Sequence, residues 1–135
     1  MRLLPLFLAV CVAAAPAAAD PSPAAANDKR AIGAMMEEYT LIAGGWYLDK
    51  KCGYLSPELK KEFEEQVSFN TSGMHIVLGA SEASLRQMQE AARETAEGEH
   101  WGCDNPKTRD VVVHAVANSR KLNKTLSQLA DSKNP

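Results

Sequence analysis

The sequence predicts an all-α fold. We expect a small four-helix bundle, with helices that are kinked or broken in places, one disulfide, and a cleavable signal peptide in front. Four stretches of the 135-residue chain repeat apolar residues at spacings of three and four, the period of one helix face. No stretch alternates as a strand does. Two cysteines outside the N-terminal leader, Cys52 and Cys103, form an even number that favours pairing in an oxidising compartment.

The N-terminal residues have the layout of a secretory signal peptide. Arg2 precedes an apolar run that passes into an Ala-rich stretch, and the expected cleavage follows Ala19. A Pro/Ala-rich segment comes next, and its composition is typical of flexible chain. The expected divisions are the signal peptide over 1–19, a flexible leader over 20–28, a single helical domain over 29–131 and a disordered tail over 132–135.

The first expected helix begins at Lys29 and ends near Cys52-Gly53, with two lysines in its last turn, where cations suit the helix dipole. Its apolar face is formed by Ile32, Met35, Tyr39, Ile42 and Trp46. Gly44-Gly45 interrupts this helix at a cost of about 1 kcal/mol per glycine relative to alanine. Either the helix kinks there or another backbone comes very close.

The second expected helix begins with Ser56 as N-cap and Pro57 at the first helical position. Its apolar residues include Leu59, Phe63 and Val67. Residues 68–73 are poor helix formers, so a break or bend is expected there, and Gly79 is expected to stop the helix.

Two further helices complete the bundle. Ser81 caps the third, which ends at Gly98 and has a face of small residues that would let a neighbour approach closely: Leu85, Met88, Ala92 and Ala96. Asn105-Pro106 opens the fourth. Its stripe is formed by Val112, Ala115, Ser119, Leu122, Leu126 and Leu129. Four amphipathic helices with short connections make a bundle the default architecture.

The net charge of the chain indicates which classes of partner the sequence does not favour. The chain has 15 Lys and Arg, one of them Arg2 in the leader, against 17 Asp and Glu, so the exported part carries a net charge near −3. A mildly acidic surface of mixed sign does not favour nucleic acid or an anionic membrane as partner. We expect no membrane span after signal cleavage, because the most apolar later segment is short.

The residues around the two cysteines suggest a binding surface. Trp46 and Tyr54 flank Cys52, and His100 and Trp101 precede Cys103, so a Cys52–Cys103 disulfide would bring the rings together. The predicted binding surface consists of Trp46, Tyr54, His100, Trp101 and Arg109, with Asp49 on its rim. The alternative is that the rings only pack against the sulfur atoms and the bundle end.

The sequence favours no enzyme and no bound cofactor. Gly79-Ala80-Ser81-Glu82-Ala83 lacks the last glycine and the strand of a nucleophile elbow. The single Glu97-x-x-His100 lacks the second copy that a di-iron site needs. Met74-His75, Met35-Met36 and His100 are soft ligands for copper without the spacing of a defined site, so no metal residues are assigned.

The leading hypothesis is an exported, periplasmic or secreted, interaction module that binds an unknown protein or a small apolar ligand. A homodimer is left open, because the narrow aliphatic stripes could close against a second copy. The layout of one long-range disulfide in a small exported helical domain is similar to that of periplasmic acid-stress chaperones. That resemblance implies, as an alternative, a chaperone that partly unfolds and exposes apolar surface as pH drops. A copper carrier or a small enzyme is the second alternative.

Overall fold

The computed structural model describes residues 23–133. They form the helices α1 (Pro23–Cys52), α2 (Pro57–Ile76), α3 (Glu82–Glu97) and α4 (Pro106–Lys133), with a short 3-10 helix, η1 (Glu99–Trp101), between α3 and α4. No strand occurs among these residues. The expected all-α bundle of four helices is therefore confirmed. The expected signal peptide lies outside the described residues.

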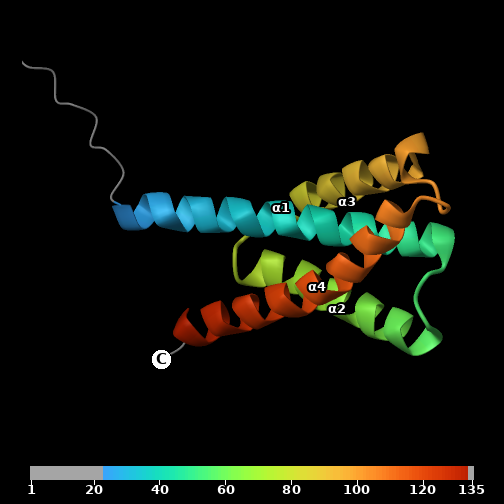
Figure 1. The fold of residues 1–135 in the computed structure, drawn as a ribbon. Coiled ribbons are helices and arrows are strands. Elements are labelled where there is room, and N and C mark those ends of the chain that lie inside the picture. Colours follow the sequence, from blue (N-terminus) through green and yellow to red (C-terminus); the bar gives the residue numbers. More distant parts are fainter. Residues whose placement is uncertain (1–22, 134–135) are drawn as a thin grey trace, which may run out of the picture.

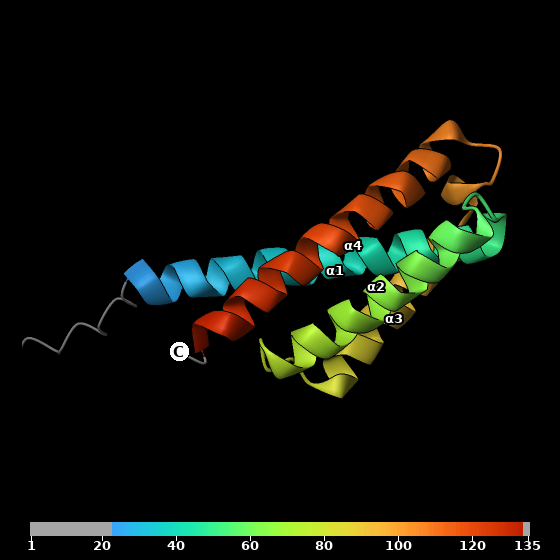
Figure 2. The same cartoon turned by 90° about the horizontal axis from the view of Figure 1, so that it is seen from below.

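α1 is the central helix of the bundle. α3 lies along one side of α1, α4 crosses α1, and α2 packs chiefly against α4 (Figures 1 and 2). α2 and α3 have little contact with each other, so the bundle is open and its helices are not all mutually packed. The N-terminal end of α1 extends past the other helices, and residues 29–34 are exposed.

The predicted start signals of α2 and α3 are confirmed. The Oγ atoms of Ser56 and Ser81 each accept a hydrogen bond from the backbone N–H three residues on, at 3.3 and 3.1 Å. Pro57 occupies the first position of α2, where its missing N–H costs nothing. Gly53 and Gly79 follow α1 and α2 with φ of 67° and 71°, values that glycine adopts without strain. Serine caps and glycine turns thus fix these boundaries.

Two boundaries differ from the expectation. α1 begins at Pro23 instead of Lys29, so the described part of the expected flexible leader, residues 23–28, is helical. Its run of three alanines has high helix propensity but no apolar periodicity to reveal it. α4 likewise continues two residues beyond the expected domain end, to Lys133. α2 ends at Ile76 and, as expected, Gly79 closes its C-terminal end, because the Gly79 N–H donates to the carbonyl oxygen of His75 at 3.1 Å.

α2 runs unbroken through residues 68–73, where a break was expected. Asn70 explains this difference. Its side chain is fully buried between α2 and α4, and its Nδ2 donates to the backbone oxygen of Ser119 at 3.1 Å and to Oδ1 of Asn123 at 2.6 Å. A residue of low helix propensity is thus held in the helix by tertiary hydrogen bonds.

A second polar contact joins three helices inside the bundle. The buried Tyr39 hydroxyl of α1 lies 2.9 Å from the hydroxyl of Thr71 on α2, and it accepts a hydrogen bond of 2.6 Å from Nε2 of Gln89 on α3. Because a buried hydroxyl without partners would be costly, these contacts fix the register of α1, α2 and α3.

The buried apolar residues form two clusters. The larger one joins α1, α2 and α4 and is supported by Leu85 of α3; its most buried members are Tyr39, Ile42, Phe63, Met74 and Leu122. The smaller one, Leu48, Ala96 and Val112, lies at the end of the bundle that holds the cysteines. The predicted faces of the third and fourth helices are confirmed, since Leu85, Ala92 and Ala96 and most of the α4 stripe are buried.

The glycine pair of α1 marks a close approach of two helices. α1 is continuous through Gly44 and Gly45. A Cβ atom at Gly45 would lie 2.2 Å from the Cβ of Ala115 on α4 and 3.5 Å from the carbonyl oxygen of Val111. Of the two expected explanations, the approach of another backbone is correct for Gly45.

Within residues 23–133, no helix has the length and apolar character needed to cross a membrane.

Candidate binding site beside the disulfide

The predicted disulfide between Cys52 and Cys103 is present. The two Sγ atoms are 2.06 Å apart and the Cα atoms 5.4 Å apart, within the range that a disulfide requires. The bond joins the C-terminal end of α1 to the loop between η1 and α4. It therefore holds together the two chain segments that the sequence places around the aromatic residues.

Two polar side chains strengthen this corner. Lys51 Nζ donates to the carbonyl oxygens of Ala96 at 3.2 Å and Trp101 at 3.0 Å, which lie at the end of α3 and in η1. The Tyr54 hydroxyl donates to the carbonyl oxygen of Cys103. Because backbone carbonyls at helix ends lack partners within the helix, these bonds complete the C-terminal end of α3 and tie it to α1.

Asp49 has a structural position instead of the expected place on a binding rim. Its side chain is 1% exposed, and Oδ1 accepts a hydrogen bond of 2.9 Å from the backbone N–H of Leu55. The carboxylate thus holds the turn between α1 and α2 from inside. Its burial makes it unavailable to a partner at the surface.

We expect Asp49→Ala to lower the free energy of unfolding by about 1–2 kcal/mol, because the Leu55 N–H would lose its acceptor in a partly buried place. Asp49→Asn keeps an oxygen at the same point and should lose less. Urea denaturation followed by circular dichroism measures both variants. Equal losses for the alanine and asparagine variants would show that this hydrogen bond is not the cause.

The five predicted binding residues have different surroundings in the structure. The Arg109 guanidinium lies over the Tyr54 ring at 5.2 Å, and His100 is exposed in η1. Trp101 packs against the smaller core cluster. Trp46 instead packs against the larger cluster, where its buried indole N–H has no hydrogen-bond partner.

The surroundings of Trp46 support the packing alternative for this ring. Its ring centroid lies 5.0 Å from that of Tyr47, and Lys50 Nζ lies 4.1 Å above the Trp46 ring. Burial raises the pKa of Tyr47, and the nearby carboxylate of Glu90 raises it further. The pKa of Glu90 itself is lowered, chiefly by its hydrogen bond from Arg93. Trp46 is thus packed between the larger cluster, the Tyr47 ring and the Lys50 side chain.

Trp101 lines an apolar groove that the other four residues do not line. The groove lies on the outer face of α1 between α3 and α4, and it consists of two adjoining hollows of about 170 and 340 Å³. Leu41, Trp101 and Val111 belong to both hollows. We call this the Trp101 groove. The remaining lining of its inner hollow is Thr40, Gly44, Leu48, Ala91, Ala92, Thr95 and Ala96.

The outer hollow of the Trp101 groove has a polar edge provided by α4. Lys107, Asp110, His114 and Asn118 line it, and His114 Nδ1 lies 2.7 Å from the carbonyl oxygen of Asp110. Leu41 stands between the apolar and the polar parts, with 64% of its surface exposed. Leu41, Trp101 and Val111 together give the groove a contiguous apolar surface, which is the kind of feature that marks an interaction site.

Sequence reasoning missed Leu41, Gly44 and Val111 as groove residues. Leu41 lies outside the stripe that forms the main core face of α1, so it was not assigned to any face. Leu41, Gly44 and Leu48 are spaced three and four apart and form a second, shorter stripe on the same helix. That spacing is the signal that could have revealed the floor of the groove.

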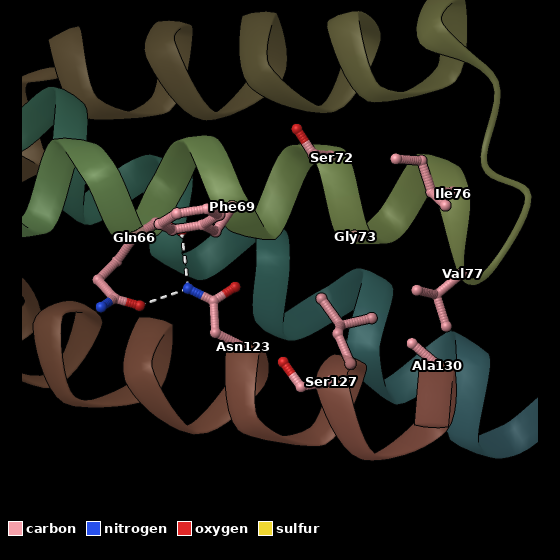
Figure 3. A pocket seen from close by; sticks show the side chains of 10 residues that line it. Gln66, Phe69, Ser72, Gly73, Ile76, Val77, Asn123, Ser127 and Ala130 are labelled. Carbon is pink, nitrogen blue, oxygen red and sulfur yellow. Dashed lines mark hydrogen bonds between the residues drawn. The ribbon is translucent and has the colours of Figure 1, made fainter. Parts of the chain in front are cut away.

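A second apolar hollow of about 460 Å³ lies between the C-terminal halves of α2 and α4. Phe69 and Ile76 flank it and are 66% and 78% exposed, while Gln66 and Asn123 close one end by a hydrogen bond across it (Figure 3). We call it the Phe69 groove. It is more open than the Trp101 groove and shares no residue with it.

Potential ligands for metal are not gathered in the described part of the chain. Within residues 23–133, no three His, Cys, Asp or Glu side chains are placed to hold one ion together. Met74 is fully buried in the core, whereas the neighbouring His75 is exposed and its Nδ1 lies 2.7 Å from the carbonyl oxygen of Ala80. Ser81, considered as a nucleophile, has its hydroxyl engaged as the N-cap of α3.

No known protein family, curated protein or solved structure matches this chain.

Proposed function

We propose that this protein is an exported interaction module that binds an apolar partner in the Trp101 groove. The observation that carries the proposal is Leu41, a large aliphatic residue 64% exposed beside Trp101 and Val111 in a groove with apolar walls. Complete burial of such a side chain stabilises by about 1.5–3 kcal/mol, and the exposed part of Leu41 forgoes its share of that free energy. A partner that covers the groove recovers this free energy.

The groove has the composition of a recognition site. Its centre is aliphatic and aromatic, and its edge contains Lys107, Asp110, His114 and Asn118. An apolar centre surrounded by polar groups of both signs is the usual arrangement where proteins bind ligands or one another. The disulfide stabilises the site, because it joins the end of α1 to the loop that follows η1, and η1 contains Trp101.

Export is part of the proposal and rests on two features. The N-terminal residues have the signal-peptide layout described above. The Cys52–Cys103 disulfide fits an oxidising compartment such as the periplasm or the extracellular space. Separation of the compartments of the producing cell, followed by mass determination of the product, would test both the location and the cleavage after Ala19.

We expect Leu41→Gln to weaken the binding of the environment-sensitive dye anilinonaphthalene sulfonate by roughly tenfold, because a polar side chain would interrupt the apolar surface of the groove. Glutamine is chosen because it adds no charge that could repel this anionic dye. Dye fluorescence titrations on the folded variant, checked by circular dichroism, provide the measurement.

Two variants serve as controls for this titration. Val113→Gln changes a residue of α4 that is 55% exposed and lines neither groove, so it should bind the dye as the natural protein does. Phe69→Gln tests the Phe69 groove in the same way. If Phe69→Gln abolishes dye binding while Leu41→Gln leaves it intact, the proposed site is in the wrong place.

A further inference from the structure

Gly44 occupies a position that packing within the chain does not explain. It lies in the middle of α1, where glycine is less favourable than alanine by about 1 kcal/mol. Its neighbour Gly45 needs the absence of a side chain, because a Cβ atom there would collide with Ala115. A Cβ atom at Gly44 would meet no atom within 4 Å. The space that it would enter is the inner hollow of the Trp101 groove.

This inner hollow is small and apolar, and we call it the slot. Apart from two threonines, its lining is entirely apolar, and seven of its residues are glycine, alanine or aliphatic: Leu41, Gly44, Leu48, Ala91, Ala92, Ala96 and Val111. Its volume of about 170 Å³ holds on the order of six methylene groups, if each takes roughly the volume of a water molecule in the liquid, about 30 Å³. Trp101 and Leu41 lie where the slot meets the outer hollow.

The polar edge of the outer hollow carries balanced charge. Lys107 and Asp110 contribute one charge of each sign, and neither forms an ion pair among the described residues. His114 and Asn118 add groups that can donate and accept hydrogen bonds. This edge has no net charge and therefore favours neither an anionic nor a cationic head, whereas an uncharged head can hydrogen-bond to its donors and acceptors.

We propose that the Trp101 groove binds a free single-chain amphiphile, with its unbranched alkyl chain in the slot beside Gly44 and an uncharged polar head at Lys107, Asp110 and His114. This inference rests on the proposed function and specifies its ligand class. The chain is assigned to the slot because the lining is apolar, the volume matches about six methylene groups, and Gly44 leaves open the space that a side chain there would occupy.

The test uses a homologous series of linear alcohols from butanol to decanol, added to the full exported chain labelled with nitrogen-15. Shifts of the Gly44 amide and the Trp101 indole N–H report binding at the slot, and the Gly73 amide reports the Phe69 groove. Affinity should rise about fourfold with each methylene and level off at about six carbons, when the slot is full. Affinity independent of chain length, or shifts centred on Gly73, would overturn the inference.

Substitutions at two glycines of α1 provide a matched pair. Gly44→Leu should fill the slot and weaken hexanol binding at least tenfold. Gly33→Leu adds the same side chain to an exposed position of the same helix, also free of neighbours within 4 Å, and should bind like the natural protein. Gly44→Ala, which adds one methyl group to the open space, should weaken binding about fourfold even if the leucine variant does not fold. Unchanged binding by these Gly44 variants contradicts the inference.

Octanoate and octylammonium, which carry one negative and one positive charge, test whether the ligand has an uncharged head. Octanol should bind at least as tightly as either ion. A preference above tenfold for octanoate would identify a fatty acid site instead, and the balanced edge would then be wrongly assigned. The proposed function and the alkyl ligand can fail separately. If Leu41→Gln loses dye binding but the affinity for alcohols does not depend on chain length, the interaction site is supported and the alkyl ligand is excluded.

Discussion

Replacement of both Cys52 and Cys103 by serine is expected to lower the free energy of unfolding by about 4 kcal/mol. The disulfide joins residues 51 positions apart, so in the unfolded chain it closes a long loop and removes much conformational freedom. Because a domain of this size has a net stability of about 5–15 kcal/mol, the loss is a large share of the total. Urea denaturation of the oxidised protein and of the double-serine variant measures it.

Addition of a reducing agent provides the internal control. It should shift the denaturation midpoint of the natural protein towards that of the double-serine variant and leave the variant unchanged. Far-ultraviolet circular dichroism of the folded variant should remain helical, since Lys51 and Tyr54 still hold the corner through their bonds to Trp101 and Cys103. An equal midpoint for the oxidised protein and the variant would contradict the expected constraint.

The helical fold could be predicted because its signals are local. The stripes of α1 and α4 repeat at the helix period, and serines start α2 and α3. The continuity of α2 could not be predicted from residues 68–73, because it depends on Asn70 bonding to α4 across the bundle. The first turns of α1 were missed for a different reason: an alanine run has helix propensity but no apolar face to mark it.

The candidate site could be predicted only in part. The disulfide brings the segments of Cys52 and Cys103 together as expected, and Trp101 lies in the groove beside it. Nearness to a cysteine along the chain does not say which helix face a side chain occupies. Trp46 and Leu48 are two residues apart, which is roughly 200° around a helix, and they pack in different clusters. The groove floor therefore had to come from the three-dimensional arrangement of α1, α3 and α4.

Gly45→Ala is expected to destabilise the protein by about 2–3 kcal/mol, although alanine is the better helix former. The new methyl group would lie 2.2 Å from the Cβ of Ala115, and the Val111 carbonyl oxygen is 3.5 Å away on the same side. Ala115 has no flexible side chain that could turn aside, so α4 itself must move away from α1. Urea denaturation measures the loss, and the helix content at zero urea should be unchanged.

The adjacent glycine and a second-site change make this prediction specific. Gly44→Ala introduces the same methyl group one position earlier, into open space, and should raise the free energy of unfolding by up to about 1 kcal/mol. Ala115→Gly removes the opposing methyl group, so the double variant Gly45→Ala/Ala115→Gly should be less destabilised than the sum of the two single changes. Additive losses would mean that α1 and α4 do not meet at these two residues. If Gly44→Ala raises the free energy of unfolding while Gly45→Ala lowers it, the two glycines have different roles: Gly45 allows α1 and α4 to pack, and Gly44 leaves the groove open.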